Sequence, residues 1–131
     1  KMSTLKVKLQ LETRGSRGAA QLINAVDTLT ITNPTINLSR VSATVTGADT
    51  IIAPSVDAER FVYIKNLGLT SAGAINTTDK LKVETADGVH IAELRAGEFL
   101  FLPYYDGNAS LLQLEASANT IQAEYAYFTR G

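Results

Sequence analysis

Few residues in this chain could carry out acid–base, nucleophilic or metal chemistry, and they are scattered. The sequence has one histidine, His90, and no cysteine. A catalytic triad needs a positioned base next to a nucleophile, and no obvious nucleophile stands near His90 in the sequence. A site of histidines and carboxylates would need a second histidine at ligand spacing or a tight acidic cluster. We therefore predict a structural role for His90, with no metal and no other cofactor.

The acidic residues of the central region are spread over separate predicted strands and turns. They are Asp79, Glu84, Asp87, Glu93 and Glu98. Two distant carboxylates can meet in a fold, so a glycosidase pair is an alternative, but the chain has no tryptophan to stack on a sugar. A cupin-like hydrolase or isomerase is a further alternative, and the single histidine disfavours it. There is no GxxxxGK[ST] phosphate loop. We predict that the protein is not an enzyme.

Composition and charge point to one folded domain spanning residues 1–131. Hydrophobic residues make up 45% of the chain and charged residues 19%, which is typical of a globular protein. With 12 basic and 13 acidic residues the net charge is −1, and no basic stripe predicts a nucleic-acid partner. No apolar run is long enough to span a bilayer, and the first residues alternate instead of forming a signal peptide. We expect no membrane partner and synthesis inside the cell.

The first half of the chain shows the period-two alternation of strands with one wet face. In residues 4–12, leucines and a valine at odd positions alternate with polar residues, and lysines on the polar side are a common way to blunt a sheet edge. Residues 28–32 alternate again, whereas residues 19–27 suit either a short helix or an extended segment. A phase slip near Ser39-Arg40 predicts a β-bulge or a bend. Residues 51–52 form a very short predicted strand.

The second half is organised around residues 80–105. Asp87-Gly88 and Ala96-Gly97 separate three apolar runs, and an Asp-Gly pair is a strong hairpin signal. The run from Phe99 to Leu102 is apolar on both faces, which predicts a deeply buried third strand of a meander, ended by Pro103. Residues 60–67 are also apolar on both faces and predict a central strand.

Across the whole chain, about nine or ten short strands with turn signals every 8–12 residues predict an all-β fold. We expect a single antiparallel β-sandwich. No helical segment is convincing, and the longest loop covers residues 68–79.

Two polar regions are the candidate partner-binding sites. The segment TRGSRG (13–18) is flexible and basic, and it is either a solvated turn or part of an N-terminal arm, residues 1–18, that contacts partners. Residues 104–108 begin with two aromatic residues at a loop, and exposed aromatic residues are typical anchors of protein contacts. The predicted binding residues are Arg14, Arg17, Tyr104, Tyr105, Asp106 and Asn108, with the 68–79 loop as a further contact.

Four segments carry a resemblance to a known class of proteins. They are FVYIKNLG (61–68), LKVETADG (81–88), ELRAGEFLFLP (93–103) and IQAEYAYF (121–128). A strand ends in Asn-x-Gly, a short hairpin follows, a Gly-Glu turn leads into an apolar strand ending in proline, and a final strand alternates. This order resembles the small virion structural proteins of tailed bacteriophages, including head-decoration (cement) proteins and minor head or tail proteins.

The resemblance covers roughly residues 60–128 and implies both a fold and a role. Such proteins are often jelly-roll β-sandwiches that work as trimers or larger rings. It implies a virion protein, made in the host cytoplasm, that binds the major capsid protein and stabilises contacts between capsid subunits. The alternative is a carbohydrate- or receptor-binding sandwich associated with a tail or a fibre.

Overall fold

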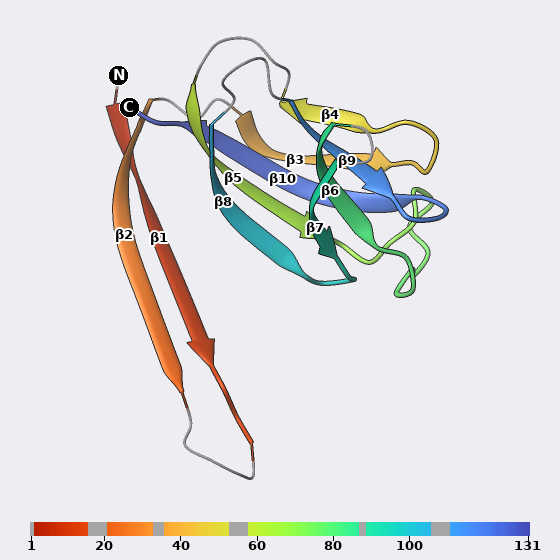
Figure 1. Cartoon of the computed structure of the whole chain (residues 1–131), viewed down its shortest axis with the longest axis horizontal. Coiled ribbons are helices and arrows are strands. Elements are labelled where there is room, and N and C mark those ends of the chain that lie inside the picture. The colour runs from red at the N-terminus through yellow and green to blue at the C-terminus, as the bar shows by residue number, and fades with distance from the viewer. Residues whose placement is uncertain (1, 16–20, 33–35, 53–57, 87–88, 106–110) are drawn as a thin grey trace.

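A computed structural model describes residues 2–15, 21–32, 36–52, 58–86, 89–105 and 111–131, and these residues form ten strands (Figure 1). This part of the chain holds no helix of the length and apolarity that a membrane crossing requires. The strands are β1 (Met2–Glu12), β2 (Leu22–Thr32), β3 (Ile36–Ala43), β4 (Asp49–Ile52), β5 (Glu59–Asn66), β6 (Leu81–Ala86), β7 (Val89–Leu94), β8 (Phe99–Tyr105), β9 (Leu112–Ala116) and β10 (Ile121–Thr129).

Eight of these strands build two four-stranded antiparallel sheets. The first sheet has the order β3-β10-β5-β8 and the second has the order β4-β9-β6-β7. The chain crosses between the sheets after β3, β4, β5, β7, β8 and β9, and this order is that of an eight-stranded jelly roll. The predicted all-β, antiparallel sandwich is therefore confirmed, and so is the jelly-roll form that the resemblance implied.

The core lies between the two sheets. Val62 and Ile64 of β5 point inward from the first sheet, while Leu81 and Val83 of β6 and Leu114 of β9 point inward from the second. All five side chains are fully buried. Residues 60–67 were predicted as a central strand, and β5 does lie between β10 and β8. Burial largely alternates along β5 and β6, as the period of two predicts, so one face of each sheet meets the core.

A β-bulge interrupts the pairing of β3 with β10. Ser39 lies opposite Tyr125, but the next pair joins Ile36 to Tyr127, so β3 carries one extra residue. The bulge is next to the predicted position at Ser39-Arg40, because the extra residue is what shifts the phase of the apolar pattern.

The prediction of a three-stranded meander with a deeply buried third strand is wrong. β6 and β7 pair in the second sheet, but β8 crosses to the first sheet and lies at its edge. Its outward side chains are accessible, with Phe99 60% and Phe101 37% exposed, and only the alternate residues face the core. Pro103 does not end the strand but lies within it, opposite Phe61, because an edge strand tolerates a missing N–H.

β1 and β2 form a separate two-stranded hairpin that belongs to neither sheet. Eleven residue pairs join them, from Met2–Thr32 to Glu12–Leu22, so the ambiguous part of β2 is extended. In Figure 1 the hairpin leaves the sandwich as a long ribbon, with its base beside the C-terminus. The base is held by a bridge between Ile31 and Arg130 and by the Gly131 N–H, which donates to the Thr30 carbonyl at 2.9 Å.

The core assignment predicts a sharp contrast between two isoleucines. Ile64→Ala removes a fully buried side chain and should lower the free energy of unfolding by about 2–5 kcal/mol. Ile75→Ala removes a side chain that is 81% exposed and should change it by no more than about 0.5 kcal/mol. Urea unfolding followed by circular dichroism measures both, and equal effects would contradict the described core.

Candidate functional site

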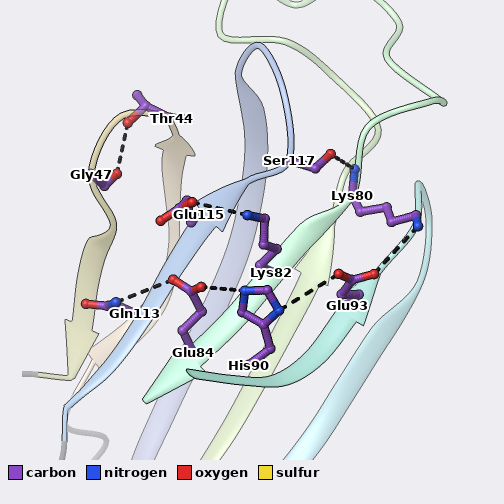
Figure 2. A network of polar contacts seen from close by, with 10 residues as sticks. All are labelled: Thr44, Gly47, Lys80, Lys82, Glu84, His90, Glu93, Gln113, Glu115 and Ser117. Atoms are coloured by element: carbon purple, nitrogen blue, oxygen red, sulfur yellow. Dashed lines mark hydrogen bonds and ion pairs between the residues drawn. The ribbon is translucent and has the colours of Figure 1, made fainter. Parts of the chain in front are cut away.

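His90, the only histidine, belongs to a polar network on the second sheet (Figure 2). Its Nε2 lies 2.8 Å from Oε2 of Glu84, whose side chain is 1% exposed. Gln113 on β9 donates from Nε2 to the other Glu84 oxygen at 3.4 Å. The Nδ1 of His90 lies 4.0 Å from Glu93. The buried Glu84 carboxylate on β6 therefore lies between the His90 imidazole on β7 and the Gln113 amide on β9.

A second irregularity in the ladder produces this arrangement. Val83 lies opposite Ala92, but the next pair joins Glu84 to His90, so Ile91 is left without a direct partner. The shift brings the imidazole face to face with the carboxylate. Spacing in the sequence does not reveal such a pair, because a regular ladder would have placed Glu84 opposite Ile91.

Charged pairs extend the network across the same sheet. Lys82 Nζ lies 3.2 Å from Glu115 Oε1, and Lys80 Nζ lies 3.6 Å from Glu93 Oε2 (Figure 2). The first pair joins β6 to β9, and the second joins the residue before β6 to β7. Cross-strand pairs of opposite charge stabilise sheets modestly. The network thus ties three strands together.

The network orients the imidazole of His90, but it supplies few of the other groups that a catalytic site needs. The groups against His90 are the carboxylates of Glu84 and Glu93, neither of which suits the nucleophile of a triad. Within the described ranges, no group of three or more His, Cys, Asp and Glu side chains is placed to hold a metal ion. The structural role of His90 stays a prediction, and its contact with the buried Glu84 carboxylate supports it.

Substitution of His90 tests that role. His90→Ala leaves the buried Glu84 carboxylate with the longer Gln113 contact, and we expect the free energy of unfolding to fall by about 1–3 kcal/mol. Glu93→Gln, which breaks an exposed pair with Lys80, should lower it by no more than about 1 kcal/mol. Chemical denaturation at pH 6 compares the two variants. A His90→Ala variant as stable as the wild type would contradict the structural role of His90.

The predicted binding residues fall at two distant places. Arg14 follows β1 at the far end of the hairpin, where its side chain is 83% exposed and pairs with Glu12 at 3.2 Å. Tyr105 ends β8 opposite Glu59, whose carbonyl accepts from the Arg130 N–H beside the hairpin base. Tyr105 is exposed, whereas the half-buried Tyr104 donates its hydroxyl to the Leu111 carbonyl at 2.9 Å. The remaining predicted residues, Arg17, Asp106 and Asn108, lie outside the described residues.

The 68–79 loop is folded by its own hydrogen bonds. The Asn76 N–H donates to the Gly68 carbonyl at 2.8 Å, and the Asn76 side chain donates to Asp79 Oδ2, also at 2.8 Å. Asn119, from the turn before β10, donates to the same oxygen at 3.0 Å. Hydrogen bonds from Asn119 and then Asn76 lower the pKa of Asp79 below its usual value, and partial desolvation opposes them. These hydrogen bonds hold the loop in place, and its Ile75 side chain is exposed to solvent.

The lowered pKa of Asp79 gives a pH-dependent prediction. A depressed pKa contributes stability that is present above the unfolded-state value, near 3.8, and is lost as the pH falls through the folded-state value. Asn119→Gly removes one donor and keeps the positive φ of 55° accessible, so the pKa of Asp79 should rise toward its usual value. Carboxyl chemical shifts followed by NMR between pH 2 and 6 measure this. Ala118→Gly, at a neighbour in the same turn, is the control and should leave the pKa of Asp79 lowered.

Sequence reasoning missed one surface feature. An apolar groove of about 860 Å³ runs between the hairpin and β8, and Val7, Leu9 and Leu11 face Phe99 and Phe101 across it. The signal was present in the two-faced apolar run of β8, but that run was interpreted as a buried strand. We call this feature the apolar groove.

Comparison with known proteins gives no relative. No family, no curated protein and no solved structure matches the chain. The proposals below therefore rest on the residues, their geometry and the resemblance described above.

Proposed function

We propose that this chain is a non-enzymatic structural protein of a tailed-bacteriophage virion, which decorates the capsid and stabilises contacts between major capsid proteins. The observation that carries the proposal is the hairpin, whose two 11-residue strands leave the sandwich instead of joining either sheet. At about 3.3 Å per residue, each strand reaches roughly 36 Å. A module of this shape can rest on one subunit and touch the next.

The exposed candidate contacts are spread in a way that suits this bridging role. Arg14 lies at the far end of the hairpin, Tyr105 lies near its base, and Ile75 projects from the 68–79 loop. Each contact alone is small, but a capsid repeats its subunits, and repeated weak contacts add up through high effective concentration. A trimer, which the resemblance implies, would multiply the contacts further.

A structural role also agrees with the polar network. His90 is engaged by two carboxylates, and the buried one, Glu84, joins β6 to β7 and β9. Such a network supports a sheet whether or not any ligand is bound. This supports a protein that acts through its surface and shape.

Charge reversal at the hairpin end tests the proposal. Arg14→Glu should weaken binding to capsid shells of the encoding phage by about tenfold, a loss of about 1.4 kcal/mol, if the hairpin end contacts an acidic capsid surface. Arg40→Glu, an exposed arginine on β3, is the matched control and should bind as the wild type does. Co-sedimentation with shells lacking the protein gives the affinities. Failure of the wild-type chain to bind the shells would overturn the proposal.

The alternative is a carbohydrate- or receptor-binding module of a tail or a fibre, and one observation favours it. A shallow hollow of about 210 Å³ lies beside the exposed Tyr105, with Arg60, Arg130 and Glu59 around it. An aromatic face next to charged hydrogen-bonding groups is a common arrangement for sugars. Glycan-array binding that is lost in Tyr105→Ala, without any binding to capsid shells, would favour this alternative.

A further inference from the structure

The distal half of the hairpin exposes apolar side chains on both of its faces. Leu9, Leu11 and Ile23 lie on the face that lines the apolar groove, and 42–53% of each is exposed. By the strand register the side chains of Leu22 and Val26 point to the opposite face, although Val26 also borders the groove, and they are 58% and 63% exposed. A two-stranded hairpin on its own is at best marginally stable in water. A hairpin with apolar residues on both faces suits a position between two other layers.

The apolar groove offers such a position. One wall is the hairpin itself and the other is the outward face of β8, where Phe99 and Phe101 are accessible. β8 pairs with β5 on one side, and no described strand pairs with it on the other. The outward face of β8 can therefore pack against a further β-layer, which would lie about 10 Å from it.

We propose that the apolar groove of one copy receives the hairpin of a second copy of this chain, and that the two copies close into a symmetric dimer. In this arrangement the stripe of Leu9, Leu11 and Ile23 packs against the equivalent stripe of its neighbour. Leu22 and Val26 on the other face pack against the neighbour's β8. This inference concerns the free protein and goes beyond the proposed function, since it requires no capsid.

Charge favours a copy of this chain over a strongly charged partner. The lining of the groove includes one cationic and one anionic residue, Lys8 and Asp27, and neither forms an ion pair within the described part of the chain. The groove is therefore neutral, which argues against nucleic acid or a polyionic peptide. The hairpin of a second copy brings the same two charges of opposite sign, so the lining of the groove stays neutral when it is occupied.

The available area also suits a dimer. Seven large apolar side chains are exposed at the groove or on the distal half of the hairpin: Leu9, Leu11, Leu22, Ile23, Val26, Phe99 and Phe101. With roughly 150–200 Å² for each side chain and about half of it exposed, they offer about 500–700 Å² per copy. An area of this size lies at the upper end of what monomers expose, and stable interfaces bury about 800 Å² per partner. The hairpin backbone and the smaller residues of the groove can supply the remainder.

Cross-linking of single-cysteine variants tests the position of the second copy. The chain has no cysteine, so each introduced thiol is unique. We would mix Val26→Cys with Phe99→Cys, which differ in mass, and add a short bis-maleimide. The expected product is a mixed dimer with one copy of each variant, which no contact within a single chain can produce. Val26→Cys mixed with Ile75→Cys, an exposed residue of the 68–79 loop, is the control and should give little mixed product.

Light scattering coupled to gel filtration tests the assembly itself. The wild type should run as a dimer of the 14.0 kDa chain that dissociates on dilution. Ile23→Lys, at an exposed position, should raise the concentration for half-dissociation by about tenfold or more while circular dichroism stays unchanged. Leu38→Lys, an equally exposed apolar residue on β3, should leave it unchanged. A wild type that is monomeric at every concentration, or an absent Val26–Phe99 product, would overturn the inference.

Discussion

The packing of the two sheets against each other is the interaction on which the rest of the structure depends. Val62 and Ile64 in the first sheet meet Leu81, Val83 and Leu114 in the second, and burial of apolar surface stabilises this contact by about 25 cal/mol per Å². Because the inner face of each sheet is buried in this contact, its outer face must meet solvent or another part of the molecule. The second sheet covers its outer face with ionic pairs, whereas the first leaves β8 beside the apolar groove.

The hairpin depends on this core through a small attachment. Ile31 is almost fully buried at the base, and Arg130 packs over the ring of Phe61, with 4.8 Å between its guanidinium carbon and the ring centroid. Phe61 in turn stacks on Phe101, with 6.2 Å between ring centroids. The outer face of the first sheet therefore anchors the start of the hairpin and leaves the rest of its length free for contacts.

The sequence was informative where one residue pattern has one physical explanation. Alternation in β1 and double-sided apolarity in β5 predicted strands in the right places, and the phase slip at Ser39 marked a true bulge. The same double-sided pattern in β8 had two explanations, since an outward apolar face can be covered by core or left at an edge. The pairing of Glu84 with His90 was not predictable, because it depends on an irregular register between β6 and β7. Of the candidate contacts, Arg14 and Tyr105 were placed on the surface, and the groove was missed.

The unbroken register of the hairpin restricts how its length can change. Each residue of β1 from Met2 to Glu12 faces one residue of β2 without a bulge, and successive side chains point to opposite faces. Loss or gain of a single residue in one strand would turn every side chain beyond that point to the other face. A related chain that keeps the apolar stripe can therefore lengthen or shorten its hairpin only in steps of two residues per strand. The length of the hairpin therefore changes in intervals of about 7 Å.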